Sequence, residues 1–106
     1  MIKELNTQSF KETVSSSEYA VIDCYGDYCF ACELLAPVFD ALAGKMPGVD
    51  FCRINLSQNF ELAEEMQIFS FPTTLFYKNG ELITSVIGSV EEETLIEAVS
   101  QILYGE

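Results

Sequence analysis

The sequence predicts an α/β fold in which a mixed central sheet of four to five strands is flanked by four helices. The run Tyr19–Tyr25 is largely apolar and of strand length, as expected of a strand buried on both faces. Asn79-Gly80 separates two further strand-length runs and is the strongest short signal for a hairpin. Segments with apolar residues at helical spacing alternate with the earlier strands, which implies parallel crossovers in front of an antiparallel hairpin.

The N-terminal segment predicts a short strand and a short helix. A short extra strand near Ile2–Leu5 is optional. Ser9 and Glu12 have capping-box spacing and predict the start of a helix with Phe10 and Val14 on its inner side.

A longer helix is expected after the first buried strand, from Cys29 to about Lys45. Pro37 lies inside it and should kink it, and Gly44 and Pro47-Gly48 end it. Its apolar residues recur at helical spacing: Leu34, Leu35, Val38, Phe39 and Leu42.

The second half predicts a strand at Val49–Asn55, a short helix at Phe60–Met66 and the hairpin strands Thr73–Lys78 and Glu81–Ile87.

A final helix completes the predicted fold. Ser89 and Glu92 form a second capping-box pattern, and Glu91–Glu93 suits the positive end of a helix dipole. The predicted inner stripe of this helix is Leu95, Ala98, Val99, Ile102 and Leu103.

Composition limits the function classes. The 106 residues fit one domain, 1–106, and 49% of them are hydrophobic, which is enough for a core. Seventeen acidic residues against five basic ones give a net charge of −12, so we expect binding to neither nucleic acid nor a membrane surface. The absence of His excludes Ser-His-Asp and Cys-His catalysis and most zinc chemistry.

The chain shows no apolar leader at its N-terminus, and its longest apolar runs are of strand length. We therefore expect a cytoplasmic protein in a reducing environment. The four Cys residues are then catalytic, metal-binding or simply buried, and not a disulfide framework.

Cys29-Phe30-Ala31-Cys32 follows a strand and opens a helix. The helix dipole favours a thiolate on Cys29, at the exposed end, and Cys32 is placed to resolve a mixed disulfide. Half of a zinc site is one alternative, although a second Cys or His pair is missing. Cys24, Cys29, Cys32 and Cys52 also have the spacing of a two-iron cluster, but Cys24 and Cys52 lie in apolar strands, where free Cys is usually buried.

Asp23 is a carboxylate inside an apolar strand. Burial should raise its pKa, which suits a proton carrier for thiol chemistry, although a structural carboxyl remains the alternative. Arg53, the only Arg, is the expected charge partner. If these two face each other, Cys24 and Cys52 lie on the opposite face with Cα atoms about 8 Å apart, beyond the reach of a disulfide. Pro72 stands at a strand start, where its missing N–H is tolerated.

These residues together resemble the thioredoxin family, from about Leu5 to Tyr104. The resemblance rests on five segments in the family's order: Val21–Cys32, Leu35-Ala36-Pro37, Phe71-Pro72-Thr73, Phe76–Gly80 and Ile87-Gly88.

The resemblance implies a thioredoxin fold and a monomeric protein-disulfide reductase that needs no cofactor beyond its own Cys29–Cys32 disulfide. Cys29 would attack, Cys32 would resolve and Asp23 would be the buried acid/base. Arg53 stands where the family usually has Lys. Substrate would dock on Tyr25, Tyr28, Phe30, Phe71, Gly88 and Pro72, the last in the position of the family's cis-proline.

The implied partners are disulfide-containing proteins and a reductase that depends on NADPH or ferredoxin. The sequence departs from the family at Phe30-Ala31, where Gly-Pro is usual, and at Glu33, where Lys is common. A redox-inactive binding module, or an isomerase or oxidase on the same fold, is the alternative function.

Overall fold

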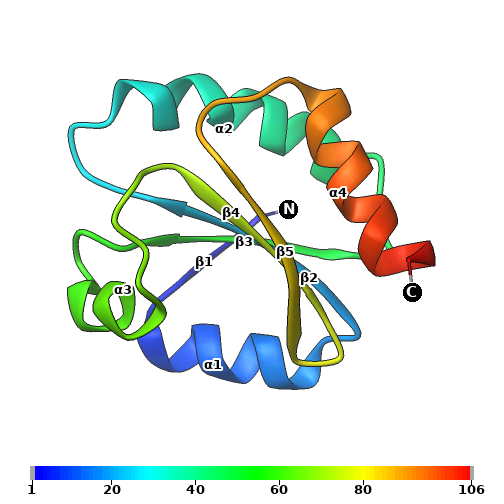
Figure 1. The fold of residues 1–106 in the computed structure, drawn as a ribbon, viewed down its shortest axis with the longest axis horizontal. Coiled ribbons are helices and arrows are strands. Elements are labelled where there is room, and N and C mark those ends of the chain that lie inside the picture. Colours follow the sequence, from blue (N-terminus) through cyan, green and yellow to red (C-terminus); the bar gives the residue numbers. More distant parts are fainter. Residues whose placement is uncertain (1, 106) are drawn as a thin grey trace.

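The computed structural model describes residues 2–105. Its elements are β1 (Lys3–Leu5), α1 (Thr7–Ser16), β2 (Tyr19–Tyr25), α2 (Phe30–Ala43), β3 (Asp50–Asn55), α3 (Phe60–Met66), β4 (Thr73–Lys78), β5 (Glu81–Ile87) and α4 (Glu92–Tyr104). The strands form one sheet in the order β1-β3-β2-β4-β5, parallel from β1 to β2 and antiparallel from β2 to β5. The predicted fold class is confirmed, with five strands and four helices (Figure 1).

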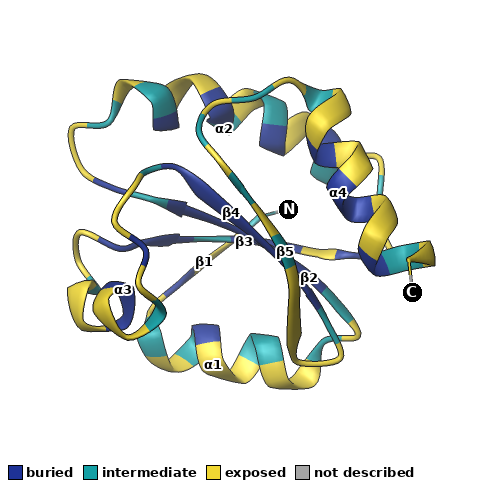
Figure 2. Ribbon diagram, in the orientation of Figure 1, coloured by how far each residue is buried: buried dark blue, intermediate teal, exposed yellow. Residues whose placement is uncertain are grey.

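Helices cover both faces of the sheet. α1 and α3 lie on one face, and α2 and α4 lie on the other (Figure 1). Each face has its own apolar core, one containing Phe10, Ile22 and Leu62, the other containing Phe39 and Phe76. Figure 2 shows that both helical layers bury one side and expose the other, the amphipathic pattern expected of helices on a sheet.

The central strand β2 is buried on both faces, as its apolar run predicts. Ile22 and Cys24 point into the α1/α3 core, while Val21 points into the α2/α4 core. Because side chains alternate along a strand, Asp23 shares the α2/α4 face with Val21. A carboxylate is thereby placed in an apolar layer.

The strand register agrees with the expectation that Cys24 and Cys52, the two cysteines outside the Cys29–Cys32 motif, are not bridged to each other. Asp23 pairs with Arg53 across β2 and β3, so Cys24 and Cys52 are offset by two residues. Both thiols are free and buried, which confirms that they are not bridged to each other.

The hairpin between β4 and β5 turns at Asn79-Gly80, as predicted. Both residues have positive φ, 52° and 83°, the conformation that this dipeptide tolerates best. The register shifts beside Phe76 and Tyr77, which leaves one extra residue on β5.

Both predicted capping boxes are wrong. Asn6 caps α1, and its side chain and that of Ser9 bond reciprocally to the two backbone amides, so Ser9 is the third helical residue and not the cap. Glu91 precedes α4 without a side-chain cap bond, and Ser89 lies outside the helix. Several polar residues stand near each helix start, and their spacing alone does not show where the helix begins or whether a side chain caps it.

Other boundaries shift by one or two residues. α2 ends at Ala43, before Lys45, and β3 begins at Asp50, after Val49.

Within residues 2–105, no helix combines the length and the apolar character needed to cross a membrane.

Candidate active site

Cys29 and Cys32 form a disulfide at the start of α2, with Cα atoms 5.2 Å apart. Cys29 is the N-cap of the helix, and its sulfur accepts a hydrogen bond from the Cys32 N–H at 3.1 Å. Cys29 is half-buried, whereas Cys32 is only 7% exposed. The sulfur at the helix end is therefore the one that a partner can reach, and the helix amide stabilises negative charge on it.

A second loop meets the disulfide. The Phe71–Pro72 peptide is cis, and the Phe71 carbonyl oxygen lies 3.7 Å from the Cys29 sulfur. Gly88, with φ of 97°, donates its N–H to the Pro72 carbonyl at 2.8 Å. Pro72 is buried, while Phe71 and Gly88 are half-buried. Cys29, the Phe71 backbone and Gly88 are thus linked in one strip of surface.

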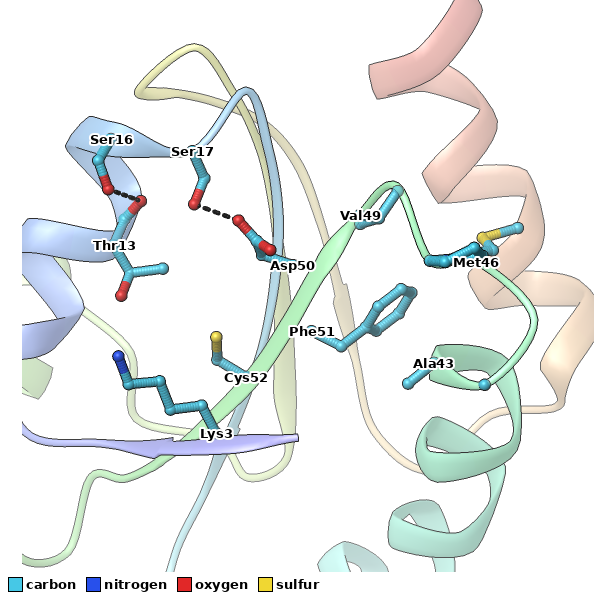
Figure 3. Close-up of a pocket in the computed structure, with 12 residues that line it drawn as sticks. Lys3, Thr13, Ser16, Ser17, Ala43, Met46, Val49, Asp50, Phe51 and Cys52 are labelled. Atoms are coloured by element: carbon cyan, nitrogen blue, oxygen red, sulfur yellow. Dashed lines mark hydrogen bonds between the residues drawn. The ribbon is translucent and has the colours of Figure 1, made fainter. Parts of the chain in front are cut away.

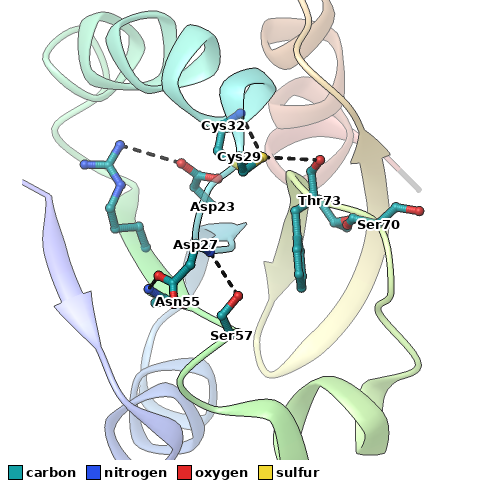
Figure 4. Close-up of a disulfide and its surroundings, with 10 residues drawn as sticks. Asp23, Asp27, Cys29, Cys32, Asn55, Ser57, Ser70 and Thr73 are labelled. Carbon is teal, nitrogen blue, oxygen red and sulfur yellow. Dashed lines mark hydrogen bonds and ion pairs between the residues drawn. A yellow bond between two sulfur atoms is a disulfide. The ribbon is translucent and has the colours of Figure 1, made fainter.

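Asp23 lies under α2, and its side chain is 2% exposed. Figure 4 shows its side chain projecting from β2 toward the start of α2, where Cys29 and Cys32 lie. Arg53 Nη2 is 3.6 Å from Asp23 Oδ2 and 3.3 Å from Asp40 Oδ1, so the guanidinium is shared with a more exposed carboxylate.

Burial raises the pKa of Asp23 to about 6, because the loss of water outweighs the lowering effect of the nearby Arg53 charge. A carboxyl with this pKa can both accept and release a proton near neutral pH.

Three aromatic side chains predicted at the docking surface differ in exposure. Tyr28 is fully exposed and Phe30 is 73% exposed, so the residues directly before and after Cys29 both present an aromatic side chain to solvent. Tyr28 also has a φ of 54°, a left-handed conformation directly before the motif. Tyr25 is half-buried and donates its hydroxyl to Glu4 Oε2 at 2.9 Å, which fixes it against β1.

A polar network beneath the loop before Cys29 was not predicted. The Asp27 N–H donates to Ser57 Oγ, and Asn55 Nδ2 donates to Asp27 Oδ1, each at 2.9 Å (Figure 4). These contacts join segments 28 and 30 residues apart. No local pattern signals them, because they depend on β3 lying next to β2.

Gly26 lies where this loop passes the Phe71 ring. A Cβ at position 26 would be 2.5 Å from a Phe71 ring carbon and 3.0 Å from Ser57 Oγ. Only glycine lets the two loops approach this closely.

We expect Gly26→Ala to destabilise the protein by about 1–3 kcal/mol and to slow thiol exchange, because it displaces Phe71 from Cys29. Urea unfolding measures the first effect. Gly48→Ala is the matched control, since a Cβ there has no atom within 4 Å and no positive φ to oppose it. Equal stability of the two variants would contradict the close approach.

An apolar hollow of about 290 Å³ lies beside Phe71. Its walls include Phe60, Ile68 and Phe69, and both phenylalanines are largely exposed. No local sequence pattern predicts this hollow, because the α3 segment and the loop before Pro72 come together only in the fold.

A larger hollow, of about 650 Å³, opens at the other end of the sheet (Figure 3). It is lined by Lys3, Asp50, Cys52 and the end of α2, whereas the disulfide is at the start of α2. Burial raises the pKa of Cys52, with a further rise from Asp50, so its thiol is a poor nucleophile.

The alternative metal sites find no geometric support in residues 2–105. Cys24 and Cys52 point into the α1/α3 core, on the face opposite Asp23 and α2. The same residues contain no group of three or more His, Cys, Asp or Glu side chains arranged to hold a metal ion.

Comparisons with known proteins agree with this geometry. A family model described as Thioredoxin matches residues 1–101. The chain is 36% identical over 104 residues to the M-type chloroplastic thioredoxin of Spinacia oleracea, a match that covers 96% of this chain and 58% of that protein. It is 27% identical over 101 residues to the thioredoxin of Chlamydia pneumoniae, covering 95% of this chain and 98% of that protein.

Solved structures show the same arrangement. The crystal structure of thioredoxin F from spinach chloroplast (short form) superposes with a TM-score of 0.88 at 27% identity, covering 96% of this chain and 93% of that one.

Proposed function

The chain belongs to the thioredoxin family, and from this membership and the geometry at Cys29 we propose that it is a protein-disulfide reductase. One observation carries the proposal: the disulfide closes the first turn of α2 with Cys29 accessible and Cys32 buried. The same chemistry makes it a thiol-disulfide oxidoreductase that needs no cofactor beyond these two sulfurs.

The proposed reaction transfers two electrons in two exchanges. The Cys29 thiolate attacks one sulfur of a substrate disulfide, and the other substrate sulfur leaves as a thiolate. Cys32 then loses its proton and attacks the Cys29 sulfur. The Cys29–Cys32 disulfide forms, and the second substrate sulfur is released. The protons of the two cysteines end on the two substrate thiols.

Asp23 serves the second exchange as the proton acceptor for Cys32. Its raised pKa of about 6 lies close to neutral pH, which suits a group that accepts and then releases a proton. Arg53 keeps the carboxyl in place and limits the rise, because its positive charge favours the ionised form.

The proposed partners are proteins with accessible disulfides and a reductase that uses NADPH or ferredoxin. An extended substrate segment would pair with the backbone of Phe71 and rest on Tyr28, Phe30 and Gly88. We place this activity in the reducing cytoplasm, where free buried thiols such as Cys24 and Cys52 persist.

Two measurements test the proposal together. With dithiothreitol as electron donor, the chain should accelerate the precipitation of insulin by reducing its interchain disulfides. Equilibration with glutathione at pH 7 should give a potential near the roughly −270 mV typical of thioredoxin, because Phe30 and Ala31 add no charge and exposed Asp27 and Glu33 oppose a thiolate on Cys29. No acceleration would favour a binding module, and a potential near about −180 mV would favour an isomerase or oxidase.

A further inference from the structure

Two buried oxygen atoms sit on neighbouring strands without a hydrogen-bond partner among residues 2–105. They are Oδ1 of Asp23 and Oγ1 of Thr74. Asp23 and Thr74 are directly opposite each other in the antiparallel pair β2/β4, and Thr74 is 0% exposed. Residues so paired carry their Cβ atoms on one face of the sheet, about 4.5–5.5 Å apart.

Asp23 therefore stands in a row of three side chains across three strands. Arg53 on β3 flanks it on one side and holds Oδ2, and Thr74 on β4 flanks it on the other side. A buried hydroxyl and a buried carboxyl oxygen left unpaired would each cost free energy, and such groups are paired in nearly all native proteins.

We propose that Thr74 is a positioning residue for Asp23: its hydroxyl binds Oδ1 of the carboxyl, directly or through one water molecule, in both protonation states. A hydroxyl suits this role because it both donates and accepts. It donates to Oδ1 when Asp23 is ionised, and it accepts from the O–H of Oδ1 when Asp23 is protonated.

The row also favours one oxygen as the site of the proton. The positively charged Arg53 guanidinium lies 3.6 Å from Oδ2 and has only donors, so it favours Oδ2 as the oxygen without the proton. The proton that Asp23 takes from Cys32 in the proposed reaction then resides on Oδ1, facing Thr74. This consequence rests on the proposed function, whereas the hydrogen bond itself does not.

Three charged side chains near Asp23 affect its pKa. Arg53 on β3 lowers its pKa, while Asp40 on α2 and Glu4 on β1 raise it. The buried side of α4 contributes only apolar residues, Leu95, Ala98, Val99 and Ile102. Thr74 is the neighbour on β4, and it is neutral.

The test is the titration of the Asp23 carboxyl by ¹³C NMR in the oxidised chain, where neither Cys29 nor Cys32 titrates. Thr74→Val keeps the shape and removes the hydroxyl. We expect it to raise the pKa of Asp23 by about one pH unit, because a hydrogen bond to the ionised carboxylate is stronger than one to the neutral acid. Thr74→Ser should restore the wild-type titration.

Thr73→Val is the matched control for this titration, since its hydroxyl donates to the Ser70 carbonyl. It should leave the pKa of Asp23 unchanged. An unchanged Asp23 titration in Thr74→Val would overturn the proposal, as would a shift of equal size in Thr73→Val.

The pH profile of disulfide reduction separates this inference from the proposed function. If the Thr74–Asp23 hydrogen bond and the role of Asp23 as proton acceptor are both correct, the rate of disulfide reduction in Thr74→Val rises at a higher pH than in wild type. The difference in pH equals the shift of the Asp23 pKa measured by NMR. A shifted titration with an unshifted rate profile supports the hydrogen bond and contradicts the role of Asp23 as proton acceptor.

Discussion

Cys32→Ser is expected to abolish turnover of disulfide substrates while leaving the first attack by Cys29 intact. The substrate then remains bound to Cys29 as a mixed disulfide, one per chain. Resolution by an external thiol should be slower by at least about a thousandfold, because the intramolecular thiol is held in position by the first turn of α2. Non-reducing electrophoresis with insulin detects the trapped complex, and the precipitation assay measures the loss of rate.

Cys24→Ala and Cys52→Ala are the matched controls. Both thiols are buried in the α1/α3 core, away from the disulfide, so each variant should keep its turnover and trap nothing. Wild-type turnover in Cys32→Ser would show that another thiol resolves the complex. Trapping by Cys29→Ser would show that Cys29 is not the attacking residue.

Asp23→Ala is expected to stabilise the folded protein at pH 7 and to slow the resolving step. Burial raises the pKa of Asp23 from 3.8 to about 6, so between these values the folded state binds more protons than the unfolded state. Stability therefore falls as the pH rises through this window, and the loss is complete above it. About two pH units correspond to about 3 kcal/mol, of which roughly 2 kcal/mol should be recovered after the cost of the small cavity.

Urea unfolding at several pH values measures this gain. The stability gain of Asp23→Ala should shrink below pH 6. Below about pH 4, where both states of wild type are protonated, it should reverse to a loss of about 1 kcal/mol, because only the cost of the cavity remains. Asp40→Ala is the control: it removes the other partner of Arg53 from an exposed position and should change stability by less than about 1 kcal/mol. A net loss of stability in Asp23→Ala at pH 7 would mean that pairing with Arg53 outweighs burial.

The kinetic effect of Asp23→Ala should be at least roughly 100-fold above neutral pH, because a positioned proton acceptor typically contributes that much. Single-turnover measurements locate it in the resolving step and not in the first attack. An unchanged resolving rate would assign Asp23 a structural role only.

Local sequence patterns were sufficient for the elements that carry the site. The apolar run of β2, the Asn79-Gly80 turn and the apolar stripe of α2 each depend on neighbours within one strand, turn or helix. The Cys29–Cys32 pair belongs to the same class, since both sulfurs lie on one helical turn. Helix starts were less predictable, because Asn6 and Ser9 are both good caps and the local sequence does not show which of them the helix uses.

Local sequence patterns are enough to predict a mixed sheet with helices on both faces, a pair of cysteines at a helix start and a carboxylate inside the central strand. The surroundings of that carboxylate, in contrast, depend on the tertiary structure. Strand register placed Arg53 on one side of Asp23 and Thr74 on the other, and loop packing brought Phe71 to Cys29 and Gly26. Register and loop contacts join residues far apart in the chain, and they follow from burying both faces of the sheet at once, which no local pattern encodes.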